Sequence, residues 1–445
     1  MTLVSPLRHR AVGLGSWTVR ARYRTALAIT LAAVCATTVL TATPGTAQTV
    51  TDGSTDSTFT VTTDGYIDEV NAIAVMGSGR IVIGGPFGVE RLNTDGTDDS
   101  SFTRIEFYEP YRDPASLFPP AVQSVLRRGT KILVGGENLC LDDFGSNCRG
   151  IFRFDESGRI DNTFRSESWY SDGDVFSIGW RSAAAGSGED NIITGGNKPG
   201  FESSLPVVAC IRSGGAGCLA FRDYEGSGGT RIDVVAVMAS GRIVVGGDFD
   251  GGIKRLEING VVDLTFSPPD ALGTGMVTSI VQTGSKILVG GSFAGRIKRL
   301  TESGSEDTTF TPPTLNGDVY AIAVQGDGKI LVGGSFAGKI KRLNSDGSTD
   351  GTFVPPRLDN SVRTIALQDD GKILIGGDFD EAIKRLNNPS QSSSDSRSGT
   401  ILGGGGDSSS NAVWIIVIAA AGLAVVGGGV AAGVGIARRR KPAAQ

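Results

Sequence analysis

Histidine is nearly absent from this chain of 445 residues, in which His9 is the only one. The rest of the chain therefore offers no His general base, which excludes a Ser-His-Asp triad, and no His ligand for a metal. Aspartate is plentiful, but pairs such as Asp142-Asp143 and Asp369-Asp370 stand in turn-rich stretches, where Asp normally accepts backbone hydrogen bonds. We predict no catalytic residue, no metal site and no cofactor. Asp-rich turns offer oxygen ligands for Ca²⁺, but none has a complete calcium-loop spacing.

Positive charge is scarce in the middle of the chain. All 47 Asp and Glu lie between residues 48 and 411, whereas nine of the 42 Lys and Arg lie outside these bounds. This leaves 33 basic against 47 acidic residues in the middle, a net charge of −14. An acidic body offers no electrostatic footprint for nucleic acid, so we predict no nucleic-acid partner.

Long apolar runs are restricted to the two ends of the chain. Five Arg residues precede the first run, TALAITLAAVCATTVL, and the small residues GTA follow it before Gln48. This is the order of a secretory signal. We predict a signal peptide over 1–47 that is removed after Ala47, which places the body outside the cytoplasm.

The second apolar run, AVWIIVIAAAGLAVVGGGVAAGVGIA, is followed by three Arg and one Lys. About 20 apolar residues cross a bilayer, and basic flanks stay on the cytoplasmic side. We predict a transmembrane helix over 412–437, a basic cytoplasmic tail over 438–445 and a flexible Ser/Gly/Asp-rich tether over 389–411. The chain is thus expected to be a single-pass protein of the cell membrane, with its N-terminal body extracytoplasmic and its C-terminus cytoplasmic.

Cysteine is limited to five residues, of which Cys35 lies in the predicted signal peptide. The other four form two pairs eight residues apart, Cys140 with Cys148 and Cys210 with Cys218. Each pair encloses a polar, Gly-containing turn, so in an oxidising compartment each is expected to form a local disulfide. A metal site would need closer ligand spacing and usually His.

The segment between the two apolar runs has no sustained helical period. Runs of four to eight β-branched and apolar residues, separated by Gly and Asp turns, are typical of antiparallel strands. Seven repeats each contain three such runs and a weaker fourth one, which is the pattern of a β-propeller blade. The predicted fold class is therefore all-β, a seven-bladed β-propeller over 48–388. A Gly-Gly pair ends one run of each repeat, beginning at Gly84, Gly135, Gly195, Gly246, Gly290, Gly333 and Gly376.

Five repeats also share an Arg that is followed by Asp eight residues on and by Phe eleven on. We interpret the pattern as structural, an ion pair within a blade and a packed aromatic ring. The last repeat has Arg385 without these partners, whereas Asp56 and Phe59 stand near the start of the mature chain with no strands before them. We predict that residues 51–60 form the outer strand of the seventh blade and close the ring. The five triplets are Arg91, Asp99, Phe102; Arg153, Asp161, Phe164; Arg255, Asp263, Phe266; Arg299, Asp307, Phe310; and Arg342, Asp350, Phe353.

The recurring segments VQGDGKILVGGSF and RLNSDGSTDGTF resemble the bacterial delta-60 repeat, a family of exported tandem repeats. The resemblance covers residues 51–388 and implies a β-propeller of unknown function without catalytic residues. It is weakest in the third repeat, where the Arg-Asp-Phe spacing is lost. If that repeat is not a blade, the ring has six blades and a large insertion.

Two insertions depart from the repeat, RIEFYEPYRDPASLFPP between the first two blades and RSESWYSDG between the second and third. Both occupy the connection from the outer strand of one blade to the inner strand of the next, so they should be neighbours on one face. Clustered aromatics with a polar rim are shared by protein hot spots and sugar-stacking platforms. The alternative is that these rings only pack their own loops. The predicted ligand-binding residues are Phe107, Tyr108, Tyr111, Arg112, Trp169 and Tyr170.

These features favour a membrane-anchored, non-catalytic binding module that recognises a surface protein or a cell-wall polysaccharide. Its contact with the membrane is expected through its own C-terminal helix. The alternatives are a carbohydrate-active hydrolase or lyase that uses a carboxylate pair, and a structural surface protein. The flexible tether favours binding, because a display stalk serves a domain that must reach a partner.

Overall fold

The computed structural model describes the middle of the chain, within one compact unit that begins at Thr49. The predicted signal peptide, transmembrane helix and basic tail lie outside the described residues, as does the predicted tether apart from 389–391. Within the described part of the chain, no helix is long and apolar enough to cross a membrane. The described residues are 50–63, 67–108, 120–142, 147–164, 173–182, 190–198, 205–218, 221–225 and 228–391.

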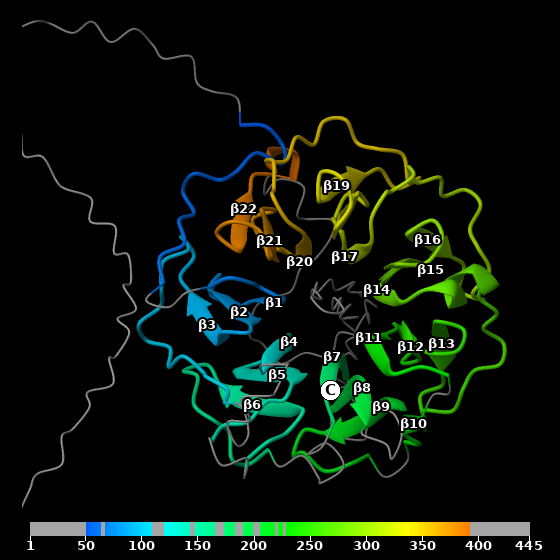
Figure 1. Ribbon diagram of the computed structural model, residues 1–445, viewed down its shortest axis with the longest axis horizontal. Helices are drawn as coiled ribbons and strands as arrows, with labels where there is room; N and C mark the ends of the chain where they lie inside the picture. Colours follow the sequence, from blue (N-terminus) through cyan, green and yellow to red (C-terminus); the bar gives the residue numbers. More distant parts are fainter. Residues whose placement is uncertain are drawn as a thin grey trace, which may run out of the picture. The chain divides into compact units, whose positions relative to one another are not determined.

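Seven antiparallel sheets surround one axis (Figure 1). In each sheet the strands follow one another in sequence order, with the first nearest the axis and the last toward the rim. This all-β arrangement agrees with the predicted seven-bladed propeller. The third repeat also forms a sheet, so the six-bladed alternative is wrong. The first strands are β1 (Ala72–Val75), β4 (Ala121–Arg128), β7 (Val175–Arg181), β11 (Arg231–Val237), β14 (Val277–Thr283), β17 (Val319–Val324) and β20 (Val362–Leu367).

The remaining elements complete the blades. Of two short 3-10 helices, η3 (Asp270–Thr274) connects the fourth and fifth blades, and η4 (Pro389–Gln391) follows the seventh. The second strands are β2 (Ile81–Gly85), β5 (Lys131–Glu137), β8 (Asn191–Lys198), β12 (Ile243–Asp248), β15 (Lys286–Gly291), β18 (Ile330–Gly334) and β21 (Ile373–Gly377). The third strands are β3 (Gly88–Leu92), β6 (Ile151–Asp155), β9 (Leu205–Arg212), β13 (Ile253–Leu256), β16 (Ile297–Leu300), β19 (Ile340–Leu343) and β22 (Ile383–Leu386), and β10 (Tyr224–Glu225) is a fourth strand of the third blade.

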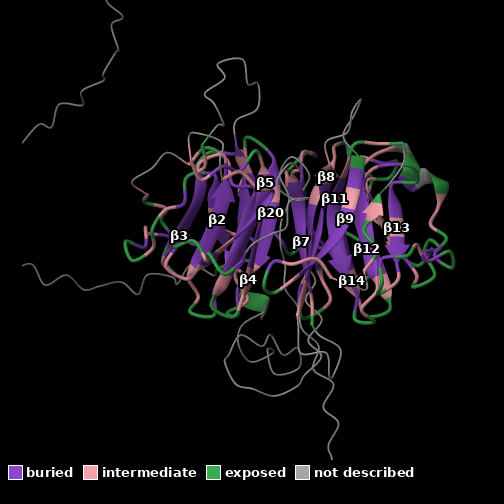
Figure 2. Cartoon of the chain, turned by 90° about the horizontal axis from the view of Figure 1, so that it is seen from below, coloured by how far each residue is buried: buried purple, intermediate pink, exposed green. Residues whose placement is uncertain are grey.

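The Gly-Gly pairs allow adjacent blades to approach closely. The strands run from one face of the ring to the other and are buried along most of their length (Figure 2). A Cβ atom on Gly84, the first Gly of its pair, would lie 2.5 Å from Cγ1 of Val122 in the next blade. A Cβ atom on Gly291, the second Gly of its pair, would lie 2.0 Å from the carbonyl oxygen of Met276 in its own blade. Both positions therefore require a residue without a side chain.

The fourth segment of most blades is a turn. The prediction of an outer strand is wrong for six blades. In the described residues the chain pairs with the third strand only through isolated bridges, one in most of these blades, such as Leu300 with Glu306, and two in the first, and then turns. Thr309 explains the turn, because its N–H and hydroxyl donate to Oδ1 of Asp307 over 3.1 and 2.7 Å. Such local hydrogen bonds compete with an extended ladder.

The repeated Arg joins each blade to the next. In the fifth blade, Arg299 Nε donates to Asp307 Oδ2 over 2.8 Å, and the guanidinium lies 4.8 Å from the centre of the Phe310 ring. Its Nη1 donates to the carbonyl oxygen of Ser345, in the turn after the third strand of the sixth blade. The predicted ion pair is confirmed, and the Arg also contacts the neighbouring blade. The ion pair recurs with N–O distances of 2.7 to 3.0 Å in Arg91–Asp99, Arg153–Asp161, Arg255–Asp263 and Arg342–Asp350.

The N-terminal segment completes the seventh blade. Arg385 Nε donates to Asp56 Oδ2 over 2.7 Å, and the guanidinium lies 4.8 Å from the centre of the Phe59 ring. The N–H of Asp56 donates to the carbonyl oxygen of Arg385 over 2.8 Å. Nη1 of Arg385 also donates to the carbonyl oxygen of Thr94 in the first blade. The predicted closure by residues 51–60 is confirmed, through a turn rather than a full strand.

The third blade keeps the motif spacing with other residue types. Cys210, Cys218 and Phe221 are eight and eleven residues apart, and a disulfide joins the two cysteines where other blades have the Arg-Asp ion pair. The guanidinium that reaches the next blade comes instead from Arg181 of β7. It donates to the carbonyl oxygen of Ile258 over 2.5 Å and lies 5.8 Å from the centre of the Phe221 ring. The Arg-Asp pair is absent from this repeat, as predicted, but the spacing itself persists, and a covalent bond takes the place of the ion pair.

The substitution Asp56→Ala should weaken the closure of the ring. It leaves the buried Arg385 guanidinium without its carboxylate, and loss of one partner of a buried ion pair costs about 3 kcal/mol. We expect the free energy of unfolding, measured in urea, to fall by about this amount. Ser57→Ala changes an exposed neighbour and is the control, which should leave this free energy unchanged. An equal loss in both variants would contradict the closure by Asp56.

Acid should weaken the same contacts in every blade that has them. Burial alone would raise the pKa of Asp263, but hydrogen bonds from Thr265 and Arg255 more than offset it and hold the pKa at about 2. A carboxyl group whose pKa is lowered by folding stabilises the fold above its unfolded-state pKa, about 3.9, and this stabilisation is lost as pH falls through the folded-state value. We expect the melting temperature to fall steeply between about pH 4 and about pH 2. A flat melting temperature across that window would show that these ion pairs contribute nothing.

Candidate ligand site

One residue bulges out of the first strand in six blades. In each, the register between the first and second strands shifts by one residue, for instance between Ile232 and Val234 of β11. A bulge redirects the side chain of the extra residue. Asn71 holds the corresponding position immediately before β1. In blade order, the residues at this position are Asn71, Gln123, Phe176, Asp233, Thr278, Tyr320 and Arg363.

The bulge lies where each first strand begins, and the antiparallel second strand ends at the same face of the propeller. We define the axial ring as three residues from each blade at this face: the bulge residue, the residue two positions before it and the residue after the Gly-Gly pair. The residue types at the flanking positions of the repeat are nearly the same in all blades, whereas each blade has a different set of three residues in the axial ring. It holds seven acidic residues and two arginines, so negative charge dominates. Two positions before the bulge stand Glu69, Ala121, Asp174, Arg231, Met276, Asp318 and Ser361. After the Gly-Gly pairs stand Pro86, Glu137, Asn197, Asp248, Ser292, Ser335 and Asp378.

Asp233 is a fully buried carboxyl group in the axial ring. Nε of Arg231 lies 2.7 Å from its Oδ1, but in the described part of the chain neither carboxylate oxygen has a partner in good hydrogen-bond geometry. Burial raises the pKa of Asp233 to about 7; Arg231 opposes this, while Asp248 and Glu137 reinforce it. A buried carboxyl group that titrates near neutral pH is a feature of functional sites.

Arg363 holds two carboxylates at the junction of the seventh and first blades. Its Nη1 lies 3.4 Å from Glu69, and its Nη2 lies 3.5 Å from Asp378. Burial raises the pKa of Glu69, and Arg363 partly offsets this effect. Asn71 donates from Nδ2 to the carbonyl oxygen of Val122 over 3.3 Å. Its own Oδ1 is buried without a hydrogen-bond partner among the described residues.

Glu137 links the second blade electrostatically to the third and fourth. Gln123 Nε2 donates to Glu137 Oε1 over 3.2 Å, and the Gln123 oxygen is buried without a partner in the described ranges. Burial raises the pKa of Glu137, Asp174 raises it further, and Arg231 lowers it. Each carboxyl group on this side of the axial ring therefore influences the ionisation of its neighbours.

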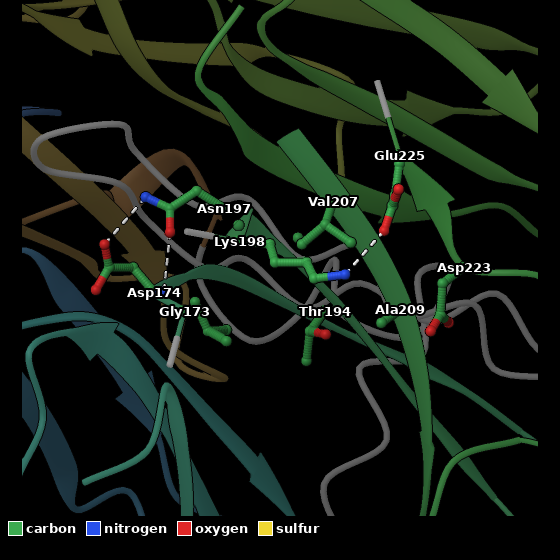
Figure 3. A pocket seen from close by; sticks show the side chains of 12 residues that line it. Gly173, Asp174, Thr194, Asn197, Lys198, Val207, Ala209, Asp223 and Glu225 are labelled. Carbon is green, nitrogen blue, oxygen red and sulfur yellow. Dashed lines mark hydrogen bonds and ion pairs between the residues drawn. The ribbon is translucent and has the colours of Figure 1, made fainter. Parts of the chain in front are cut away.

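Asp174 and Asn197 form a reciprocal pair beside a small cavity in the third blade (Figure 3). Asp174 N donates to Asn197 Oδ1 over 3.1 Å, and Asn197 Nδ2 donates to Asp174 Oδ2 over 3.0 Å. The cavity has a volume of about 20 Å³, which is room for one water. Asp223 and Glu225 also line it, and Lys198 Nζ lies 3.1 Å from Glu225 Oε1. Acidic side chains thus extend outward from the axial ring over the third blade.

The fifth and sixth blades contribute little net charge to the axial ring. Thr278 Oγ1 donates to the carbonyl oxygen of Val319 over 2.6 Å, and Tyr320 holds the next bulge position. The carboxylate of Asp318 lies 2.5 Å from Nη1 of Arg296, which neutralises it. The seventh blade adds no net charge, since Arg363 offsets Asp378, so net negative charge is concentrated in the first four blades.

The structure describes two of the six predicted ligand-binding residues. Phe107 is half-buried, with its ring centre 5.7 Å from that of Phe152 in β6, so it packs against the second blade. Tyr108 is 42% exposed, and its N–H donates to the carbonyl oxygen of Cys140 over 2.9 Å. The other four stay predictions because they lie outside the described residues: Tyr111, Arg112, Trp169 and Tyr170.

The described ends of the two insertions reach the same hairpin of the second blade. The predicted disulfide Cys140–Cys148 is confirmed and closes this hairpin between β5 and β6. Tyr108 contacts the hairpin at Cys140, and Asp174, which follows the second insertion, accepts a hydrogen bond from Asn138 N over 3.2 Å. The first insertion thus begins, and the second ends, at this one hairpin, and Asp174 itself belongs to the axial ring.

Sequence reasoning missed the axial ring, although a signal was present. The residue after each Gly-Gly pair changes from Glu137 to Asp248 to Ser335 between strands that are otherwise almost the same. The carboxyl, amide and hydroxyl groups of the axial ring accept hydrogen bonds, and its carboxyl groups can also transfer protons. In the ranges that the structure describes, no three His, Cys, Asp or Glu side chains gather closely enough to hold a metal ion.

Five segments of the chain match the family described as "Domain of unknown function (DUF5122) beta-propeller". They are residues 77–102, 239–266, 285–310, 325–353 and 368–390, in the first and last four blades. The match supports a β-propeller repeat family of unknown function, as the resemblance of the repeats implied. A comparison with curated proteins gave no match.

Two solved structures have a similar fold. Virginiamycin B lyase from Staphylococcus aureus aligns with a TM-score of 0.51 and 17% identity, over 72% of this chain and 95% of that chain. The extracellular domain of a proposed hybrid two component system from B. thetaiotaomicron aligns with a TM-score of 0.50 and 14% identity, over 74% of this chain. This chain spans 39% of the length of that domain. At these identities the similarity concerns the fold alone.

The substitution Asp233→Asn should stabilise the protein at neutral and alkaline pH. Because folding raises the pKa of Asp233 to about 7, ionising this group destabilises the folded state once the pH exceeds the unfolded-state value of about 3.9. We expect a gain of about 4 kcal/mol in the free energy of unfolding at pH 8, shrinking to almost none near pH 4. Urea denaturation at both values measures it. A variant that is less stable than the wild type at pH 8 would refute the unfavourable burial of this charge.

Proposed function

We propose that this chain is an extracytoplasmic binding propeller, which recognises a surface protein or a cell-wall polysaccharide with the face that carries the axial ring. One observation carries the proposal: the Arg, Asp and Gly-Gly positions recur from blade to blade, whereas no two blades have the same residues in the axial ring. A rigid scaffold with variable positions on one face is the usual arrangement of a recognition site.

The polar groups of the axial ring support a ligand in particular. The oxygens of Asn71 and Gln123 are buried and unpartnered within the described residues, and Asp233 is a buried carboxyl group without good hydrogen-bond partners there. Buried polar groups are almost always satisfied in the functional state of a protein. A ligand that donates hydrogen bonds would satisfy them.

Aromatic residues of the two insertions extend the proposed surface. Tyr108 is exposed at the described end of the first insertion. It offers a ring with a polar tip, which suits both sugars and protein partners. Phe107 packs against Phe152 of the second blade and so supports the connection that carries Tyr108. The remaining members proposed for this surface are Tyr111, Arg112, Trp169 and Tyr170.

The same proposal places the propeller at the cell surface. A signal peptide over 1–47 would export it, and the tether over 389–411 would join it to a membrane helix over 412–437 and a cytoplasmic tail over 438–445. The two disulfides support this compartment, because such bonds persist in oxidising surroundings.

A second candidate function is cleavage of a polysaccharide by a hydrolase or lyase with a carboxylate pair. The observation that favours it is that the pKa values of Glu137 and Asp233 are both raised, as a general acid requires. We prefer binding to catalysis because several carboxyl groups of the axial ring influence one another's ionisation. No two of them are distinguished from the others as a catalytic pair would be.

Binding of the full-length protein to a panel of exported surface proteins and cell-wall polysaccharides tests the proposal. The double variant Glu69→Gln, Glu137→Gln removes two ring charges at nearly constant side-chain volume, and it should weaken binding at least about tenfold. Asp327→Asn removes a charge from the exposed turn between β17 and β18, at the opposite ends of the strands, and should bind like the wild type.

Three outcomes would change the proposal. Equal binding by the wild type and both variants would remove the axial ring as the site. Loss of binding in Tyr108→Ala would add the first insertion to it, and binding unaffected by this variant would exclude Tyr108. Release of soluble fragments from a bound polysaccharide would replace the binding module by the enzyme.

A further inference from the structure

The axial ring distributes its acceptor oxygens and its cations unevenly. Arg363 stands in the seventh blade and Arg231 in the fourth, and each lies against carboxylates. The ring positions of the three blades between them hold neither Lys nor Arg. These blades supply acceptor oxygens instead, and we call this group the acceptor arc: Glu69, Asn71, Gln123, Glu137 and Asp174.

Two amide side chains in the acceptor arc have an unused oxygen. Asn71 and Gln123 are 1% and 5% exposed. Their amide nitrogens are occupied, one by the carbonyl oxygen of Val122 and the other by the carboxylate of Glu137. Asn71 Oδ1 and Gln123 Oε1 have no hydrogen-bond partner among the described residues. Because buried acceptors are nearly always paired, these two oxygens require a donor.

The axial ring itself indicates which donor fits. The guanidinium of Arg363 bridges Glu69 and Asp378, and the guanidinium of Arg231 lies beside Asp233 and 5.0 Å from the centre of the Phe176 ring. A guanidinium presents five N–H donors and no acceptor, so it suits a site made of carboxylate and amide oxygens. A further cation within the acceptor arc would pair with carboxylates of blades whose own ring positions supply no cation.

We propose that the acceptor arc binds the cationic side chain, Arg or Lys, of a basic segment of a protein partner. This inference rests on the proposed function and names the chemistry of its ligand. A neutral polysaccharide brings as many acceptors as donors, and its acceptors gain nothing against carboxylates. Amino sugars bring an ammonium group, but the group that the ring already holds twice is a guanidinium, which a protein segment supplies.

Asp233 gives the binding a pH dependence. It faces Arg231 on its own strand, Asp248 on β12 and Glu137 on β5, and burial raises its pKa to about 7. A bound cation favours the ionised form of a neighbouring carboxyl group. Affinity should therefore rise between about pH 6 and about pH 8, and it should fall with added salt.

The probe is a fluorescent Gly/Ser peptide that carries two Arg residues, with matched peptides in which Lys or the neutral isostere citrulline replaces Arg. We expect the full-length protein to bind the Arg and Lys peptides and to bind the citrulline peptide at least about tenfold more weakly. Glu137→Gln should lower the affinity for the Arg peptide about tenfold. Glu381→Gln makes the same charge change at an exposed position outside the axial ring and should bind like the wild type.

A further variant separates lost binding from lost folding. Asp233→Asn should weaken binding of the Arg peptide at pH 8 while it raises the melting temperature. Equal binding of the Arg and citrulline peptides, or equal effects of Glu137→Gln and Glu381→Gln, would overturn the proposal. Binding of chitosan oligomers without the Arg peptide would overturn it in favour of an amino sugar, and binding of Ca²⁺ alone in favour of a metal.

The inference and the proposed function fail separately. If a panel protein or polysaccharide binds through the axial ring whether or not it carries positive charge, the proposed function stands and the cationic ligand is wrong. If the ring variants affect no ligand of the panel and no peptide, both are wrong.

Discussion

A guanidinium group, buried in four blades and half-buried in three, couples each blade to its neighbour, and the closed ring depends on it. Arg342 is fully buried, and its nitrogens lie 2.7 Å from Asp350 of its own blade and 2.6 Å from Asp52 of the N-terminal segment. A charge is tolerated at such a position only when hydrogen-bonded groups surround it, so the Arg holds both blades at fixed positions. The Gly-Gly pairs act at the inner side of the same contact, where they let the first strand of one blade approach the second strand of another.

Because these contacts hold the blades together, the residues of the axial ring are free to differ. The ring includes groups that cost stability, such as Asp233 and the unpartnered oxygens of Asn71 and Gln123. Natural proteins retain such groups where function requires them. In the fifth blade the bulge residue is neutral and fully hydrogen-bonded, since the Thr278 hydroxyl donates to the carbonyl oxygen of Val319. The same bulge therefore accommodates either a hydrogen-bonded residue or one with unpartnered oxygens, and the strand pairing of the blade is the same in both cases.

Patterns that are contiguous in the sequence predicted much of the fold, and patterns spread over the chain did not. Asp56 and Phe59 were assigned to the seventh blade because their spacing repeats within one short segment. Cys210 and Cys218 have the same spacing as the ion pairs but different residue types, so their equivalence became visible only when the strands were paired. The outer strand was overpredicted because side-chain hydrogen bonds to Asp replaced the ladder. The axial ring was missed because a bulge breaks the two-residue alternation of facing, and its members come from seven separate repeats.

The two disulfides lie in the second and third blades, and the first of them closes the hairpin that the described ends of both insertions contact. Cys140–Cys148 closes the hairpin from which Asn138 donates to Asp174, and Cys210–Cys218 takes the place of an ion pair. Inserted residues add conformational entropy to the unfolded chain, which folding must overcome, and a local cross-link removes part of it. A covalent bond also keeps its strength when carboxyl groups are protonated, whereas an Arg-Asp ion pair does not. The blades that carry most of the acceptor arc are thus held partly by bonds that do not depend on pH, while the charge of the arc itself does.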